Sequence, residues 1–374
     1  MPTATSTLSP SSTPSEQNTG KSSSIYAAAP LVSTNSIRLL EFDPLPAVST
    51  SIDSPSEISC KLYSVDLTTC PRYVTLSYMW GNEPAARPIL INGETFLVRE
   101  NLWTFLKRAR DESPPFHGPL WIDAICIDQD NVLERNHQVL LMGDIYTNAH
   151  LVISWLGADD EQYAEGLDYV TELSEIGPLT SGLASFNLDL PKLENLAQIY
   201  LHEYWKRTWI IQEVVLPLDA EIWIGPSRRI RHQTLTELEM WLYVWPKHLK
   251  SQLTHMSGIR ILDQRAVRHN YEPQGALKIG YDATDFFTLL HTTKTTRCKD
   301  VRDRVFAILA LIPAGERARL DIVPDYTMST LELCKVVEGK VRDALGHGVR
   351  SCAIFSDLVR EVLEIGLDGN LEGA

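Results

Sequence analysis

The sequence predicts an α/β fold, a parallel sheet flanked by helices and followed by a mainly helical C-terminal region. The first reason is that short apolar strands alternate with helical segments between residues 73 and 176, as they do in parallel sheets. The second is that from about Thr234 onward the chain changes to segments of helical period. The length of 374 residues, 44% of them hydrophobic, is sufficient for one large or two medium domains.

The N-terminal part is expected to be a tail followed by lead-in strands. Sixteen of the first 24 residues are Ser, Thr or Pro. Such a segment buries too little apolar area to offset its ordering entropy, so residues 1–35 are predicted to be a disordered tail. Residues 36–72 contain two strand-like stretches, IRLLEF and ISCKLYSVDL, and are predicted to be lead-in strands.

Residues 73–215 hold the alternating elements. The Asn92-Gly93 pair is a strong hairpin signal, and the apolar run PLWIDAICID has the length of a strand buried on both faces. In chain order we predict a strand over 73–81, a hairpin over 87–100, a helix over 101–112, a strand over 119–128, a helix over 131–149, a strand over 151–157, a helix ending near 176, an insertion over 178–200 and a helix over 204–215.

Residues 216–374 are predicted to be mainly helical. A hairpin over 220–233 closes the preceding unit. Helical periods then occupy residues 235–245, 283–294, 303–312 and 329–345.

Composition excludes several classes of partner and site. The net charge of −14 argues against nucleic acid, since phosphate binding needs a basic face. The six cysteines are scattered without a C-x-x-C pair, so we expect neither a disulfide framework nor a metal site, and reduced thiols fit a cytoplasmic protein. No apolar run approaches the ~20 residues that a membrane-spanning helix needs, and no secretory signal is recognisable.

Two polar clusters lie at predicted strand ends, where parallel sheets bind ligands. Ser77, Tyr78, Trp80 and Gly81 end the strand over 73–81 and could line a site, or the aromatic rings could simply be buried in the core. Asp123 lies inside an apolar run, where a carboxylate must be hydrogen-bonded or paired.

The Asp123 cluster has two interpretations. Together with Asp128, Gln129 and Asp130, it could hold a metal or a ribose hydroxyl at the strand end. The second interpretation makes Asp128 to Asp130 the cap of the next helix and Arg135 the partner of Asp123.

The third cluster is in YWKRTWIIQEVV. Glu213 follows Trp209 by four residues and Trp205 by eight, so a continuous helix would place the carboxylate on the tryptophan face. A partly desolvated carboxylate is typical of acid/base or charge-stabilising sites. The alternative is a buried structural glutamate paired with Arg207 or Arg304.

The three clusters together resemble the heterokaryon incompatibility (HET) domain of fungi. The resemblance rests on YVTLSYMWG, LWIDAICIDQDNVLERNHQVLLMGDIYTNAHLVISWLG and YWKRTWIIQEVVL, in order and spacing, over roughly residues 73–215. DVRDRVFAILALI and PDYTMSTLELC resemble segments that commonly follow that domain. The resemblance implies a role in nonself recognition, in which such domains trigger programmed cell death after incompatible cells fuse.

The resemblance also implies a distant relation to the Toll/interleukin-receptor (TIR) fold. In enzymatically active members of that fold, a W-C-x-x-E glutamate serves NAD⁺ hydrolysis, and Trp209 and Glu213 have this spacing, with Ile210 in place of the cysteine. Glu213 would then be catalytic, and NAD⁺ would be a substrate rather than a tightly bound cofactor. The strand-end residues would border the NAD⁺ site, namely Ser77, Tyr78, Trp80, Gly81, Asp123 and Trp209.

A second function stays open. The chain could be a non-enzymatic signalling module that acts by self-association or by recruiting other death-signalling proteins, as many TIR relatives do, or an inactive paralogue. Glu213 and Asp123 would then be structural carboxylates.

Overall fold

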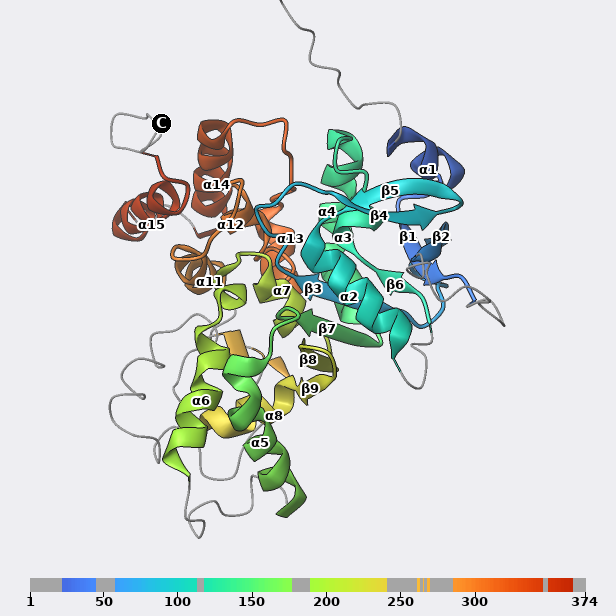
Figure 1. The fold of residues 1–374 in the computed structure, drawn as a ribbon. Helices are drawn as coiled ribbons and strands as arrows, with labels where there is room; N and C mark the ends of the chain where they lie inside the picture. Colours follow the sequence, from blue (N-terminus) through green and yellow to red (C-terminus); the bar gives the residue numbers. More distant parts are fainter. Residues whose placement is uncertain are drawn as a thin grey trace, which may run out of the picture.

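A nine-stranded mixed sheet forms the centre of the molecule (Figure 1). The computed structural model describes residues 22–44, 58–112, 118–176, 189–240, 285–345 and 349–365, together with 261, 262, 265, 268 and 269. The strand order is β5-β4-β2-β1-β6-β3-β7-β8-β9. The strands are β1 (Ser36–Phe42), β2 (Ser59–Asp66), β3 (Val74–Tyr78), β4 (Arg87–Ile91), β5 (Glu94–Val98), β6 (Leu120–Trp121), β7 (Leu151–Trp155), β8 (Ala220–Ile224) and β9 (Arg228–Arg231).

The middle of this sheet is parallel, as predicted. Strands β6, β3, β7 and β8 run in one direction, whereas β1 pairs antiparallel with both β2 and β6. The hairpin at Asn92-Gly93 is confirmed, because both residues have positive φ angles (52° and 80°) as a tight β4–β5 turn requires.

Helices cover both faces of the sheet. On one face, Phe105 of α2 packs against Trp155 and Trp223, with ring centroids 5.9 and 6.2 Å apart. On the other, Tyr146 of α4 packs edge-on against Trp121 at 5.6 Å. The described helices up to β9 are α1 (Ser22–Ala28), α2 (Glu100–Asp111), α3 (Asp123–Cys126), α4 (Val132–Asn148), η1 (Glu161–Tyr163), α5 (Ala164–Ile176), α6 (Leu190–Leu201), η4 (Glu203–Lys206) and α7 (Ile210–Val215).

The C-terminal region is mainly helical, as predicted, and packs directly on the sheet unit. Gly143 of α4 lies so close to Ala310 that a Cβ at position 143 would be 2.3 Å from the Ala310 Cβ. The α4 helix therefore needs glycine at this contact. The described helices are α8 (His232–Met240), α11 (Phe286–Thr293), α12 (Asp303–Phe306), α13 (Ala314–Leu320), α14 (Thr330–Leu345) and α15 (Val349–Val362).

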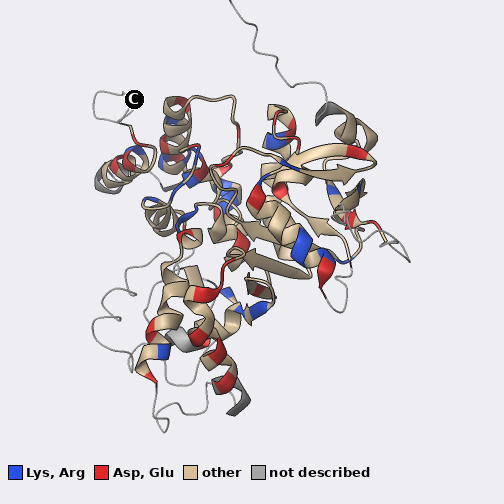
Figure 2. Cartoon of the chain, in the orientation of Figure 1, with Lys and Arg blue, Asp and Glu red and all other residues tan. Residues whose placement is uncertain are grey.

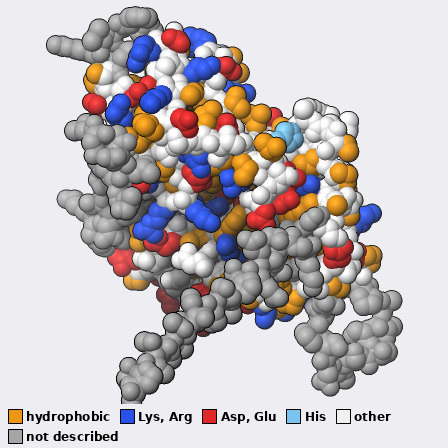
Figure 3. All heavy atoms as spheres, turned by 90° about the horizontal axis from the view of Figure 1, so that it is seen from above, with side chains coloured by type: hydrophobic (Ala, Val, Ile, Leu, Met, Phe, Trp, Pro, Cys, Tyr) orange, Lys and Arg blue, Asp and Glu red, His pale blue; other side chains and the backbone are white. Residues whose placement is uncertain are grey.

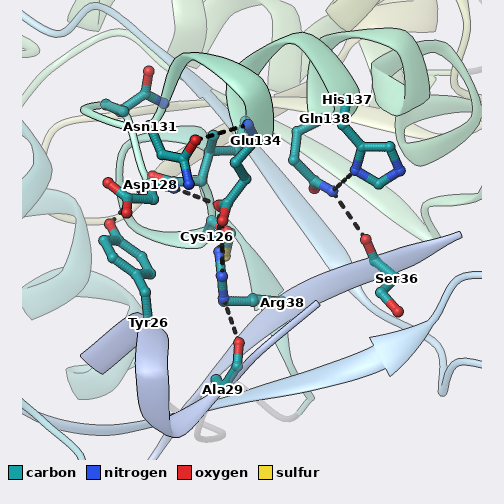
Figure 4. A network of polar contacts seen from close by, with 12 residues as sticks. Tyr26, Ala29, Ser36, Arg38, Cys126, Asp128, Asn131, Glu134, His137 and Gln138 are labelled. Atoms are coloured by element: carbon teal, nitrogen blue, oxygen red, sulfur yellow. Dashed lines mark hydrogen bonds and ion pairs between the residues drawn. The ribbon is translucent and has the colours of Figure 1, made fainter. Parts of the chain in front are cut away.

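The N-terminal segment is fastened by a buried arginine (Figure 4). Arg38 of β1 is 2% exposed, donates from Nη2 to Glu134 of α4 at 3.0 Å, and also donates to the backbone carbonyls of Ala29 and Cys126. Its guanidinium lies 4.7 Å from the centre of the Tyr26 ring. This network joins β1 to α1 and to helices α3 and α4.

The expected tail over residues 1–35 differs from the structure in its last part. Ser22–Ala28 forms helix α1, and Ile25, Tyr26 and Ala29 are buried because α1 packs beside Arg38. Residues 1–21 lie outside the described residues. The strands expected as a lead-in over 36–72 are β1 and β2, which occupy the interior of the sheet between β4 and β6.

Two further element predictions are wrong in part. The strand predicted over 119–128 is only Leu120–Trp121, and helix α3 follows at Asp123. The insertion predicted over 178–200 contains helix α6, which packs against α5, while residues 177–188 lie outside the described part. The predicted insertion is therefore in part an amphipathic helix, α6, whose apolar face packs against α5.

Charges and apolar side chains are mixed over the visible surface. Figure 2 shows acidic and basic residues interspersed along the helices and strands, and the face in Figure 3 combines apolar, acidic and basic side chains. Among the described residues, no helix is both long and apolar enough to span a membrane.

Candidate functional site

Polar side chains gather at the carboxyl ends of the parallel strands. Ser77 of β3 and Ser154 of β7 are register partners, so their side chains lie on the same face of the sheet, the one that α4 covers. Both serines are at most 1% exposed. Segments from the second and third sequence clusters, α3 and η4–α7, reach this position.

Glu213 is held in a buried ion pair. Its carboxylate accepts hydrogen bonds from Arg207, with Nη1 3.1 Å from Oε2 and Nη2 3.4 Å from Oε1, and from the Ser77 hydroxyl. The side chain of Glu213 is 2% exposed and that of Arg207 20%. Arg207 is therefore the partner expected from the sequence, whereas Arg304 pairs with Glu364.

The helix predicted over 204–215 is interrupted at Arg207. Helix η4 ends at Lys206, Arg207 is extended (φ −72°, ψ 140°), and α7 begins at Ile210. The interruption places the Arg207 guanidinium beside Glu213. Trp205 consequently does not share a helical face with Glu213, and its indole donates to the Ile199 carbonyl.

Asp123 lies beside the same arginine. The Trp80 indole donates to Asp123 Oδ2 at 3.0 Å, and the Ala124 amide donates to Oδ1 at 2.7 Å. Burial, reinforced by the negative charge of Glu213, raises the pKa of Asp123 to about 6 against the opposing effect of Arg207. Asp123 is thus paired as expected, but its described contacts do not include Arg135, whose guanidinium lies 4.4 Å from the centre of the Tyr326 ring.

The charge of Arg207 serves both carboxylates. Burial alone would lower the pKa of Arg207, but Glu213 and Asp123 outweigh burial and raise that pKa above its usual range. Arg207 therefore remains a cation between two acidic side chains. This combination of one guanidinium and two carboxylates is the electrostatic centre of the site.

The raised pKa of Asp123 predicts a specific dependence of stability on pH. The carboxyl binds its proton more tightly in the folded chain, at a pKa of about 6, than in the unfolded chain, at about 3.9. The stability from this proton is full below about pH 4 and is lost as the pH rises through about 6. As the pH rises from 4 to 7, the free energy of unfolding of an Asp123→Asn variant should therefore increase relative to that of the wild type. The expected increase is roughly 1–2 kcal/mol, since solvent screens part of the effect.

Urea unfolding of both proteins at pH 4, 5, 6 and 7 measures this gain. Asp303 also has a pKa raised to about 6, but it is present in both proteins and cancels in the difference. A stability difference that does not change with pH would contradict the prediction.

The remaining predicted residues are divided between this site and other surroundings. Tyr78 is buried on the α2 face, and burial, with a smaller effect of Asp123, raises its pKa. Gly81 is exposed with φ 75°. The Trp209 indole hydrogen-bonds Asp303, which also accepts from the Tyr326 hydroxyl, so Trp209 joins α7 to the C-terminal region rather than facing the carboxylate of Glu213.

Asp128 to Asp130, which were expected to cap the next helix, instead lie in the loop before α4, and the cap is the following residue, Asn131. Asn131 is the N-cap and accepts from the Glu134 amide at 3.1 Å, and Asp128 accepts from the Asp130 amide at 3.3 Å. In the described part of the chain no group of three or more His, Cys, Asp or Glu side chains could hold a metal ion.

Three residues of the site were not identified from the sequence. The Tyr204 hydroxyl lies 2.7 Å from Ser77 Oγ and donates to Ser154 Oγ at 2.6 Å, and Ser154 lies 2.9 Å from Nε2 of His232. One signal was available, because Ser154 in LVISW is a polar residue in a buried strand, as Ser77 is in VTLSY. Nothing in the sequence indicates that Tyr204 bridges the two.

Comparison with known proteins identifies the region that carries the site. Residues 73–213 match the family model of the heterokaryon incompatibility protein (HET). The chain is 27% identical over 350 residues to heterokaryon incompatibility protein 6, OR allele, of Neurospora crassa, an alignment covering 79% of this chain and 49% of that protein. The chain thus spans about half the length of the curated relative it matches. No solved structure matches it.

Proposed function

Because residues 73–213 form a fungal heterokaryon incompatibility domain, as the sequence predicted, we propose that this chain is a nonself-recognition effector that triggers programmed cell death. The name of its Neurospora relative supports this role, and the alignment extends over 79% of the present chain. We further propose that the protein acts in the cytoplasm, through self-association or contact with other death-signalling proteins.

We propose NAD⁺ hydrolysis as the activity of the effector, in a TIR-like manner. One observation carries this proposal: all three sequence clusters converge at the carboxyl ends of the parallel strands, where Ser77, Asp123, Arg207 and Glu213 meet. This edge is where open α/β sheets bind nucleotides. A buried carboxylate next to partly exposed side chains suits a reaction that develops positive charge on a ribose.

The residues would divide the work as follows. Glu213 would face the nicotinamide ribose and stabilise the oxocarbenium-like transition state as the glycosidic bond breaks. Asp123, which is less buried than Glu213, would accept a hydrogen bond from a ribose hydroxyl, and Trp80 would form the wall beside it. Arg207 covers Glu213 in the resting form, so substrate entry requires the guanidinium to turn outward, toward the solvent that it already contacts.

The direct test is nicotinamide release by the purified wild-type protein. NAD⁺ is incubated with protein concentrated enough to self-associate, and nicotinamide and ADP-ribose are quantified by chromatography over time. We expect equimolar accumulation of both products, absent from a heat-denatured control. Unconsumed NAD⁺ at every protein concentration would remove the enzymatic proposal.

A second candidate is a non-enzymatic signalling module. It is favoured by one observation, the 1% exposure of Glu213 together with its ion pair to Arg207, which is what a purely structural carboxylate requires. Under this proposal the protein would signal by homotypic association. A Glu213 variant would then lose cell death only because it also loses folding stability. If Glu213 is catalytic, a variant can lose activity while its folding stability is kept.

A further inference from the structure

A continuous line of hydrogen bonds runs inward from Glu213 to a histidine. The Ser77 hydroxyl donates to Glu213 Oε2 and lies 2.7 Å from the Tyr204 hydroxyl. Tyr204 donates to Ser154 Oγ at 2.6 Å, and Ser154 lies 2.9 Å from Nε2 of His232. We call Ser77, Tyr204, Ser154 and His232 the relay.

The relay is entirely removed from solvent. Tyr204, Ser154 and His232 are 0% exposed and Ser77 is 1% exposed. Burying polar groups among core side chains is costly unless each is hydrogen-bonded, so four such groups in one line are not incidental packing. At the inner end, burial and the charge of Arg265 lower the pKa of His232 well below its usual range, so the imidazole is neutral.

With Ser77 donating to Glu213 and Tyr204 donating to Ser154, the relay has room for one more proton. Four contacts separate the carboxylate from the imidazole, and the three hydroxyls between them carry three hydrogens. Ser77 uses its hydrogen on Glu213 and Tyr204 uses its hydrogen on Ser154. The Ser77–Tyr204 contact at 2.7 Å is then left with two oxygens and no hydrogen between them.

A proton on Glu213 fills this gap. Glu213 then donates to Ser77, Ser77 turns to donate to Tyr204, and Tyr204 and Ser154 continue the line to Nε2 of His232. In this arrangement Nε2 of His232 accepts from Ser154, so the hydrogen of the neutral ring is on Nδ1, which has no hydrogen-bond partner among the described residues. Every contact of the relay then contains one hydrogen.

We propose that Tyr204, Ser154 and His232 are positioning residues that make Glu213 the proton acceptor of this site. In terms of chemistry, which rests on the proposed NAD⁺ hydrolysis, the C1′–N glycosidic bond breaks with its electron pair going to nicotinamide. Water forms the new bond to C1′ and gives its proton to Glu213, and the rotation of Ser77 toward Tyr204 stabilises the protonated carboxyl. Nicotinamide leaves as a neutral molecule.

Other titratable groups interact electrostatically with Glu213 and must be separated from it. Arg207 precedes α7, Asp123 comes from α3, Tyr78 from β3 and Tyr146 from α4. Burial raises the pKa of both Tyr78 and Tyr146, so these phenols stay neutral, and Arg207 stays charged. Asp123 is the group that titrates nearby, at about 6, and an Asp123→Asn background removes it.

The test follows the Glu213 carboxyl itself by NMR, in protein labelled with ¹³C at the glutamate side-chain carboxyl. The signal is assigned by its loss in Glu213→Gln, and its midpoint is measured against pH in the Asp123→Asn background. Tyr204→Phe removes the relay hydroxyl but keeps the ring that packs edge-on against Trp205. We expect the pH at which Glu213 takes up its proton to fall by about one pH unit, a tenfold change in the protonation equilibrium.

Tyr73→Phe is the matched control. Tyr73 is as buried as Tyr204, and its hydroxyl donates to the Ile145 carbonyl at 2.6 Å, outside the relay. This variant should lose similar stability and leave the Glu213 midpoint unchanged. If Tyr204→Phe does not fold, Ser154→Ala tests the same point: it frees the Tyr204 hydrogen to fill the Ser77 contact and should also lower the midpoint.

The outcomes separate the relay from the proposed function. An unchanged midpoint in Tyr204→Phe overturns the relay, and so does a raised midpoint, which would mean that the hydrogens point from His232 toward an ionised carboxylate. The titration needs no turnover. A lowered midpoint in a protein that leaves NAD⁺ intact would therefore support the relay and refute only the hydrolysis.

Discussion

Replacing Glu213 with glutamine is expected to abolish nicotinamide release while lowering the melting temperature by only about 3 °C. Glutamine keeps a side-chain oxygen that accepts from Ser77 and fills the same volume. Arg207 loses one carboxylate but keeps Asp123, and with 20% of its side chain exposed it is also partly solvated. The charge that would stabilise the transition state is lost, which in comparable sites costs at least 10²–10³-fold in rate.

The control for this experiment is Glu338→Gln. Glu338, whose side chain is 13% exposed, is likewise paired with an arginine, Arg360, at 3.2 Å, but it belongs to α14 of the C-terminal region. Nicotinamide release should persist in this variant. Loss of release together with a large fall in melting temperature in Glu213→Gln would instead favour the non-enzymatic module, in which the carboxylate only supports the fold.

Replacing Arg207 with methionine is expected to have the largest effect on stability, about 3–5 kcal/mol. The substitution leaves the carboxylate of Glu213, whose side chain is 2% exposed, in the core without its cation. Such an uncompensated charge costs more than the net contribution of the pair, because the desolvation penalty is no longer offset. Denaturant unfolding of wild type and variant at pH 7 measures the difference.

Two further variants isolate the cause. Arg207→Met combined with Glu213→Gln removes both charges of the ion pair and should recover the part of the lost stability that is due to Glu213, whereas Asp123 still lacks its neighbouring cation. Arg304→Met provides the comparison, since Arg304 pairs with Glu364, whose side chain is 50% exposed and can be solvated. That variant should lose no more than about 1 kcal/mol from the ion pair. Equal losses in Arg207→Met and Arg304→Met would contradict the argument.

The parts of the fold that depend on local pattern were predictable. The Asn92-Gly93 turn, the strand predicted over 151–157 and found at Leu151–Trp155, and the helix predicted over 131–149 and found at Val132–Asn148 all follow from residues close in the sequence. The convergence of the three clusters was also predictable, because parallel strands bring their carboxyl ends to one edge. The pairing of Glu213 with Arg207 was one of the two partners considered.

The interruption at Arg207 could not be predicted, because its cause is distant in the chain. The Arg297 amide donates to the Lys206 carbonyl at 2.5 Å, and the Thr208 amide donates to the Arg297 carbonyl at 3.0 Å, so Arg207 forms an isolated parallel β-bridge with Arg297, 90 residues later. This pairing overrides the helical period of YWKRTWIIQEVV. Trp209 turns toward Asp303 for the same reason, since its partner comes from the C-terminal region.

The order of strands has a consequence for how the matched region can be produced as a separate protein. The matched stretch, 73–213, contains β3 to β7, yet β4 and β5 reach β6 only across β2 and β1, which are encoded before residue 73. In a polypeptide starting at residue 73, β4 and β6 would have to pair directly with each other. Otherwise both strands would keep unpaired edges that promote aggregation. The stretch that the family model matches is therefore shorter than the unit that forms the sheet, and a protein produced for experiments must include β1 and β2 with it.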